Sequence, residues 1–503
     1  MHRCLWLIAL AGCAACSPPE NSAPTAAYDL VIQAGRVINP ETQLDAIRNV
    51  GINDGRIAAV SEQPLAGAEV VDAAGLIVAP GFINLHSHAW TPLGQSFEVQ
   101  DGVTTALELE SGSYPASAFG TYEPIALANR SRPHFGASLG HAWIRSAILE
   151  GENSVTGFEE LVAGALNGSG DGLSMERPAF RQALDSDQKA ELRNRLNSGL
   201  DAGGLGIGML LDYMNEVVDS EEMQVIFEVA GARQAPIFVH IRRGVAGDTA
   251  GLIEVIELAK TTGAPVHICH LQASAMQNVT EFMRLVREAN AAGAKVTMES
   301  FPYNAGSTSI SAAVFNRDWQ KIFAITYKDV EWLATGERLT EEKWNKYRQE
   351  APGGIVVHHY NREEWTRLAS IAPDVIVASD GQPIISLESK TIPFGIGTNS
   401  RIYARYVREE GSLDLMTAVA KMTLLPARVL ENYSEAFTRK GRLSVGADAD
   451  LTIFDLDTIQ DHATFSDPFQ ASTGIAHVIV GGKFALRDGK LLEDSFPGTR
   501  ILK

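Results

Sequence analysis

The segment Gly81–His88 carries two histidines, His86 and His88, at the end of an apolar run. Residues two apart on a β-strand point to the same side, so both imidazoles would face one point. Two converging neutral imidazoles are a common part of a divalent-metal site. Alone, such a pair is weak evidence for a metal, because strand histidines also serve as ordinary core residues.

Three more polar residues end apolar, strand-like runs: His240, His270 and Asp380. Each must find a partner, because burying an unpaired polar group costs roughly 2–7 kcal/mol. A hydrogen bond in the core would explain any one of them. Together with the histidine pair, they predict a single metal site. His267 has the opposite strand parity to His270, so we expect it to face the helices and, like Cys269, to be structural.

A second metal ion would need a bridging anion, and the run Thr104–Glu110 offers two carboxylates on one strand face. Glu110 is nearer the end of the run and is the first candidate, with Glu108 second. The alternative is that both are hydrogen-bonded to neighbouring strands. No lysine ends the strand-like run 134–141, so a carbamylated lysine bridge is unsupported.

Residues 83–440 supply the elements that must position these side chains, because strand-like runs alternate there with amphipathic helical stretches. This alternation predicts an α/β fold in which parallel strands close a (β/α)₈ barrel with its catalytic rim at the strand ends. The aromatic-rich stretch 316–353 is long for a loop. It predicts either a lid or an extra packing helix pair.

The two ends of the chain, residues 28–82 and 441–503, show short β-rich runs separated by Asn-Asp-Gly and Ala-Gly turn signals. They predict one small composite β-sandwich domain built from both termini.

Residues 1–27 have the pattern of a leader and linker: a short basic start, an apolar run and a Pro/Ser/Ala stretch. The apolar run is too short to span a bilayer and is typical of a secretory signal. Leu10–Cys13 resembles a bacterial lipoprotein box, so Cys13 or its rival Cys16 would carry the lipid. We therefore expect an exported periplasmic or cell-envelope protein, held at the membrane by this anchor. The alternative is an ordinary secreted leader that ends in small residues.

Composition excludes several classes of protein. The chain has 503 residues, 45% of them hydrophobic, and a net charge of −19. Such an acidic chain lacks the clustered cations that polyanions require, so we expect no nucleic-acid partner. Three of its four cysteines lie in the first sixteen residues, which excludes a disulfide framework.

Several motifs occur in one order along the chain and together resemble a known family. They are the segment 81–88, GVTTALELESG, GHAWIR, FVHIR, VHICHL, FPYNAGST, ASDG, KMTLLPA and GADADLTIFD. The set resembles the amidohydrolase superfamily, and within it the N-acyl-D-amino-acid deacylases (D-aminoacylases), over roughly residues 28–485.

The resemblance implies a zinc-dependent hydrolase of a non-peptide C–N amide bond, with one or two zinc or other divalent ions. It places one metal at His86, His88 and Asp380, and the other at His240 and His270. Zinc would lower the pKa of bound water to about 7, and Asp380 would act as general base.

The family often has a cysteine ligand just before a glycine, whereas this chain has Ser111 before Gly112. Glu110 would then take the place of that ligand.

The resemblance also bears on the substrate. Tyr303 matches a family tyrosine that helps to bind the substrate. Gln272 and Phe394 stand where the family often has a lysine and an arginine, which would hold a substrate carboxylate. Arg242 and Arg401 are the candidate substitutes, although each could equally form a structural ion pair.

We therefore expect a small-molecule amide as substrate, most simply an N-acyl-D-amino acid. Another amide, such as a dipeptide or a cyclic amide, is the first alternative. A non-catalytic ligand-binding surface lipoprotein is the second. The natural substrate, the number of metals and the oligomeric state stay open at this point.

Overall fold

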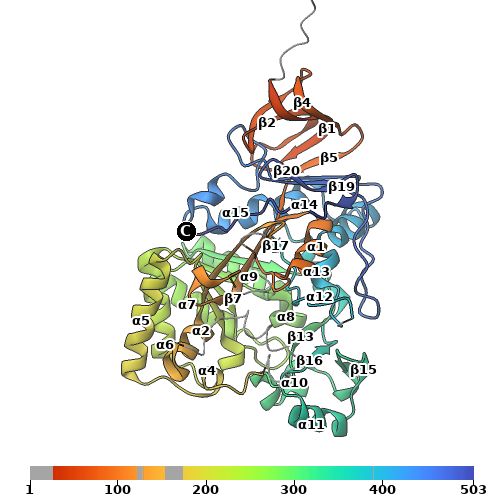
Figure 1. The fold of residues 1–503 in the computed structure, drawn as a ribbon. Helices are drawn as coiled ribbons and strands as arrows, with labels where there is room; N and C mark the ends of the chain where they lie inside the picture. Colours follow the sequence, from red (N-terminus) through yellow and green to blue (C-terminus); the bar gives the residue numbers. More distant parts are fainter. Residues whose placement is uncertain (1–26, 122–126, 128–129, 153–173, 389) are drawn as a thin grey trace, which may run out of the picture.

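The computed structural model describes residues 27–121, 127, 130–152, 174–388 and 390–503. The leader with Cys13 and Cys16 lies outside the described residues. Three sheets organise the chain, and Figure 1 shows them with their helices. Among the described residues, no helix is both long enough and apolar enough to cross a membrane.

The central sheet has eight strands, and all of its neighbouring strands are parallel. Its strands are β6 (Phe82–Asn84), β7 (Val103–Ser113), β8 (His134–Gly140), β9 (Ile207–Leu210), β10 (Ile237–His240), β11 (Val266–Ile268), β12 (Val296–Ser300) and β17 (Val375–Val377). A parallel bridge between Ser87 and Gly381 links the ends of the first and last strands. The predicted barrel is confirmed as a nearly closed eight-stranded sheet.

Helices cover the outside of this barrel in Figure 1. They are α1 (Pro92–Gln100), α2 (His141–Glu150), α4 (Pro178–Arg181), α5 (Ser186–Asp201), α6 (Ser220–Arg233), α7 (Ala250–Thr262), α8 (Leu271–Ala275), α9 (Val279–Ala291), α12 (Glu363–Ile371), α13 (Phe394–Arg401), α14 (Leu415–Met422) and α15 (Leu424–Leu430). In α9, Phe282, Met283 and Val286 recur at helical spacing and are buried. This face packs into the largest hydrophobic cluster of the chain.

Strands from both ends of the chain form a second sheet of nine strands, at the top of Figure 1. They are β1 (Tyr28–Asn39), β2 (Leu44–Asn53), β3 (Arg56–Ser61), β4 (Gly67–Asp72), β5 (Ile77–Pro80), β18 (Leu451–Phe454), β19 (Ile475–Val480), β20 (Lys483–Arg487) and β21 (Lys490–Leu491). Strand β18 joins the two ends, because it pairs with β5 on one side and β19 on the other. The predicted sheet domain built from both termini is therefore confirmed.

The last residues of the chain leave this sheet and return to the barrel. Phe135 on β8 pairs with the tail through a bridge to Arg500, and its amide donates to the carbonyl of Thr499. This tail segment therefore belongs with the barrel rather than with the terminal sheet.

Residues 306–358 form a third unit between β12 and α12, at the lower right of Figure 1. It contains β13 (Gly306–Ser309), β14 (Val330–Trp332), β15 (Glu337–Arg338), β16 (Ile355–His358), α10 (Trp319–Phe323) and α11 (Glu341–Glu350). Trp319 and Trp344 stack with ring centroids 4.8 Å apart. The aromatic-rich stretch thus forms a packed unit around a small sheet of its own, rather than a bare loop or a helix pair.

Candidate metal centre and adjoining cavity

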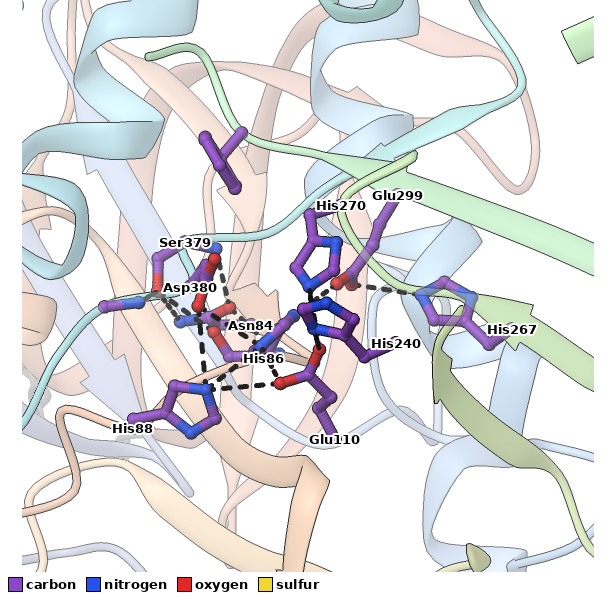
Figure 2. A network of polar contacts seen from close by, with 12 residues as sticks. Asn84, His86, His88, Glu110, His240, His267, His270, Glu299, Ser379 and Asp380 are labelled. Atoms are coloured by element: carbon purple, nitrogen blue, oxygen red, sulfur yellow. Dashed lines mark hydrogen bonds and ion pairs between the residues drawn. The ribbon is translucent and has the colours of Figure 1, made fainter. Parts of the chain in front are cut away.

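The barrel brings six of the expected residues to one point at the carboxyl ends of its strands (Figure 2). The strand-end positions explain this meeting, because parallel strands all end at the same rim. The six come from strands β6, β7, β10, β11 and β17 or from the residues that follow them: His86, His88, Glu110, His240, His270 and Asp380.

The carboxylate of Glu110 lies between two pairs of histidines. Its Oε1 is 2.8 Å from Nε2 of His270 and 3.2 Å from Nδ1 of His240. Its Oε2 is 3.2 Å from Nε2 of His86 and 3.7 Å from Nε2 of His88. One carboxylate oxygen therefore faces each pair, which is the arrangement expected of a bridging ligand.

Asp380 completes the half of the centre that contains His86 and His88. Its Oδ1 is 3.4 Å from Nε2 of His86 and 3.6 Å from Nε2 of His88. The two histidine nitrogens are themselves only 3.1 Å apart. Such a separation requires a proton or a cation between them, since two lone pairs would repel.

An irregularity in β7 sets the position of Glu110. Glu108 pairs with Ala137 of β8, but the next pairing joins Ser113 to Leu139, so extra residues of β7 bulge out between them. Gly112 lies in the bulge with φ of +61°, a conformation that favours glycine. The bulge re-aims the end of β7 toward the centre of the rim.

The backbone is in the left-handed region at two of the six residues, His270 with φ of 34° and Asp380 with φ of 52°. Neither is glycine, so each of these conformations costs energy that surrounding contacts must offset. The amide of Asp380 donates to the carbonyl of His86 at 2.9 Å, which helps to hold this conformation. Strain of this kind is typical of functional sites.

Two further carboxylates orient the histidines that follow β6. Nδ1 of His86 contacts Oε1 of Glu299 at 2.6 Å, and Nδ1 of His88 contacts Oε2 of Glu108 at 2.8 Å. The second contact gives Glu108 an orienting position, unlike the bridging one considered for it. Metal-ligating histidines commonly bond a carboxylate through their other ring nitrogen in this way.

Sequence reasoning missed Glu299, although the polar end of the apolar run 295–300 could have indicated it. His267 was expected to face the helices, and this was wrong. Its Nε2 contacts Oε2 of Glu299 at 3.0 Å, and its Nδ1 contacts Thr297 at 2.8 Å. The His267 ring instead hydrogen-bonds the carboxylate of Glu299, which in turn contacts His86. His267 therefore has a structural role in this buried polar network.

The two halves of the centre differ in electrostatics. Burial lowers the pKa of His88, but the carboxylate of Glu108 outweighs it and raises the pKa to about 10. Burial and the charge of Arg243 lower the pKa of His240 to about 4. The half with His88 therefore attracts positive charge, whereas His240 stays uncharged at neutral pH.

Burial opposes the charged form of both acidic residues of the centre, with different outcomes. At Glu110, the charges of His86 and His270 outweigh burial and hold the pKa well below its usual range. At Asp380, burial wins and raises the pKa. Glu110 therefore stays an anion between the histidines, while Asp380 exchanges a proton more readily.

A cavity opens beside the centre, and residues of the third unit form part of its lining. Apolar lining comes from Trp143, Met175, Phe180, Leu210 and Ile355, among others. Polar lining comes from five residues of the centre, His88, Glu110, His240, His270 and Asp380, and from Tyr213, Arg243, Ser307, Thr308, His358 and Tyr360. The cavity could hold a small amphipathic molecule against the cluster.

The three residues proposed from sequence to bind substrate lie elsewhere. Arg242 donates to Glu254, Asn215 and Val218, because β10 ends at His240 and strand parity no longer holds beyond it. Its neighbour Arg243 lines the cavity instead.

Tyr303 and Arg401 pack together outside the cavity lining. The Tyr303 hydroxyl donates to the carbonyl of Pro393 at 3.3 Å, and the guanidinium of Arg401 lies over the Tyr303 ring, 5.1 Å from its centroid. Arg401 also pairs with Asp461 at 2.9 Å. Both side chains therefore have partners within this region of the structure.

Comparisons with known proteins agree with this geometry. A family model described as amidohydrolase family matches residues 69–485. N-acyl-D-glutamate deacylase of Alcaligenes xylosoxydans xylosoxydans is 31% identical over 478 residues, which cover 90% of this chain and 93% of the relative.

Two solved structures have closely similar folds. N-acyl-D-glutamate deacylase from Bordetella bronchiseptica, complexed with zinc and a phosphonate inhibitor, matches with a TM-score of 0.75 and 25% identity, covering 94% of this chain and 99% of that one. D-aminoacylase, a protein with a binuclear metal centre, matches with a TM-score of 0.75 and 21% identity over 95% and 100% of the two chains.

Proposed function

The chain belongs to the amidohydrolase family, and from this premise we propose that it is a metal-dependent deacylase of N-acyl-D-amino acids. The observation that carries the proposal is the carboxylate of Glu110, which faces a pair of histidines with each of its oxygens. The names of the relatives above support the choice of substrate class.

The residues present fit one or two divalent ions. Four imidazoles and two carboxylates, all largely buried, form the donor set, and overlapping groups of three offer ligand atoms within 4.8 Å of one another. His86, His88 and Asp380 would hold one ion, His240 and His270 the other, and Glu110 would bridge them. When bound, zinc or a similar ion lowers the pKa of water and polarises the amide carbonyl.

Asp380 is placed to move the proton in this reaction. Its carboxylate faces His86 and His88 at the mouth of the cluster, and its side chain is 16% exposed, the most accessible of the ligand residues. Burial raises its pKa, which favours its role as a general base. It would take a proton from the attacking water and deliver it to the departing nitrogen.

Glu299 and Glu108 keep the two histidines of this half in orientation, because each accepts from the ring nitrogen that faces away from the cluster. The apolar wall of the cavity would exclude bulk water and receive the acyl group or an apolar side chain.

Amine release from a substrate panel tests the function. The purified protein, without its leader, is given N-acyl-D-amino acids, their L-enantiomers, dipeptides and cyclic amides, before and after chelation. We expect release only from N-acyl-D-amino acids, lost on chelation and restored by zinc. Release from dipeptides or cyclic amides alone would overturn the substrate class, and release that survives complete metal removal would overturn the metal mechanism.

We further propose that the protein is exported and lipid-anchored through Cys13 or Cys16, as the pattern of residues 1–27 suggests. Mass spectrometry of the N-terminal peptide from the native host should show an acyl-modified cysteine at one of these positions. An unmodified N-terminus after cleavage elsewhere would contradict the anchor.

A further inference from the structure

Arg243 is a buried cation without a matched anion. It is 8% exposed, it lines the cavity, and its Nε has no hydrogen-bond partner. Its nearest carboxylate is Asp212, at 3.9 Å. Asp212 accepts hydrogen bonds from Arg317 and from the backbone amide of Arg243 through Oδ1, while its Oδ2 faces the Arg243 guanidinium from too far away for a hydrogen bond and has no other partner. An incompletely paired buried charge is costly, so this guanidinium is a strong receptor for an anion.

Two uncharged polar groups that line the same cavity as Arg243 also lack partners. Both ring nitrogens of His358 are buried and unpartnered, and burial together with Arg243 holds its pKa well below the usual range. The Ser307 hydroxyl is likewise unpartnered. Both residues line the cavity, from strands β16 and β13. A neutral imidazole and a hydroxyl can donate hydrogen bonds to an anion held by the arginine.

The positions where the family resemblance implies cations are filled differently in this chain. Gln272 donates to the carbonyl of Phe301 at 3.1 Å. Phe394 packs between Phe301 and Tyr303, with ring centroids 4.7 Å from each. That side of the centre is therefore an aromatic stack. Arg243 is the only arginine or lysine among the described residues that line the cavity.

We infer that Arg243 binds the carboxylate of the substrate and that the substrate carries one carboxylate: an N-acyl-D-amino acid with an uncharged side chain. This inference rests on the proposed function. A guanidinium matches a carboxylate with two parallel hydrogen bonds. A second carboxylate, as in an acyl-glutamate, would meet the apolar wall formed by Met175, Phe180, Leu210 and Ile355, where an unpaired anion is strongly disfavoured.

The test compares three substrates: N-acetyl-D-leucine, N-acetyl-D-leucinol, which lacks the carboxylate, and N-acetyl-D-glutamate. In the wild-type holoenzyme, we expect kcat/KM to be highest for N-acetyl-D-leucine and at least about 10-fold lower for each of the other two. Arg243→Met should lower kcat/KM for N-acetyl-D-leucine by about 100-fold and that for N-acetyl-D-leucinol far less.

Arg193→Met is the matched control, because Arg193 is an exposed partner of Glu228 on the outer helices. Arg243→Lys keeps the charge but loses the paired hydrogen bonds, so it should fall between wild type and Arg243→Met. If Arg243→Met does not fold, Arg243→Lys still tests the paired hydrogen bonds. An unchanged KM and kcat/KM for N-acetyl-D-leucine in the folded Arg243 variants, or a wild-type preference for N-acetyl-D-glutamate, would overturn the inference.

A binding measurement separates this inference from the proposed function. N-acetyl-D-leucine should raise the Tm of the wild-type holoenzyme but not that of the Arg243 variant. If the wild type binds without releasing amine from any N-acyl-D-amino acid, the proposed function fails and the arginine site stands. If the wild type shows no such shift and no preference for N-acetyl-D-leucine over its leucinol, the arginine site fails.

Discussion

Two buried ionic networks lie in different parts of the molecule and differ in what supplies their positive charge. One is the centre at the barrel rim. The other lies where the barrel meets the terminal sheet, around Asp450. Lys440 donates to Asp450 at 2.7 Å, His134 of β8 contacts it at 3.2 Å, and the amide of Gly481 donates at 2.7 Å. We call this second network the Asp450 joint.

The comparison teaches how to tell a structural network from a functional one. In the Asp450 joint, the lysine is a permanent cation, so the network is complete as it stands. At the rim, the ion pairs that Glu110, Glu299 and Asp380 make among the described residues are all with histidines. Their positive charge must come from protons or a metal, both of which exchange. Buried carboxylates at the ends of barrel strands that lack a permanent cation therefore indicate a functional site. A buried carboxylate already paired with a lysine indicates a structural role.

The largest effect on activity should come from Asp380→Asn. An amide cannot take a proton from water, so we expect kcat to fall by about 100- to 10,000-fold. Steady-state kinetics and metal analysis of the purified variant are the measurements. Wild-type turnover with normal metal content would show that Asp380 is not the base.

The corresponding change in the joint, Asp450→Asn, should act on stability instead. The change removes the closer of the two carboxylates that face Lys440 and leaves it Asp448 at 3.1 Å, so the free energy of unfolding should fall, by at most about 3–5 kcal/mol. Urea unfolding measures this. The folded fraction should keep the kcat of the wild type. A loss of kcat as large as that of Asp380→Asn would show that the two networks do not differ in function.

The joint should also respond to acid. Lys440 and His134 hold the pKa of Asp450 well below its usual range, against burial. The ionised folded form is thus favoured, so this stability is present above about pH 4 and is lost as pH falls toward the folded pKa. Asp450→Asn should flatten the acid limb of a Tm-against-pH curve. An unaltered limb would mean that other groups cause it.

Glu299→Gln should produce a smaller change at the rim. The amide still fills the space but no longer fixes His86 through a charged contact. We expect metal affinity to fall by about 10- to 100-fold, measured by competition with a chelating dye. Glu281→Gln, on the exposed face of α9, is the matched control. Equal metal affinities in the two variants would show that Glu299 does not orient His86.

The smallest expected effect is a pH-dependent change in the stability of the metal-free protein. The pKa of His88 is raised to about 10, against an ordinary value of 6.5. Its contribution to stability is therefore full below about pH 6.5 and lost as pH rises through about 10. The Tm of the chelated protein should decline over this range, the opposite direction to the joint. A flat alkaline limb would show that the carboxylates at the rim do not hold protons on the histidines.

Much of the centre could be predicted from sequence, since each ligand residue ends an apolar run and parallel strands end at one rim. His240 and Asp380 were found in this way. Arg243 was not, because parity arguments stop where a strand stops, and β10 ends at His240. The choice between Glu110 and Glu108 as the bridging candidate also followed from position, but the orienting role of Glu108 required the fold.

The sequence by itself determined the α/β barrel, the sheet built from both termini and which six polar residues meet at the rim, because these depend on periodicity and on residue type at strand ends. Only the tertiary structure decided which polar atoms have partners. Gln272 and Tyr303 are tied to backbone carbonyls, while Arg243 and His358 keep free donors beside the centre. The physical reason is that hydrogen-bond satisfaction depends on residues brought together from distant strands, which local pattern does not encode.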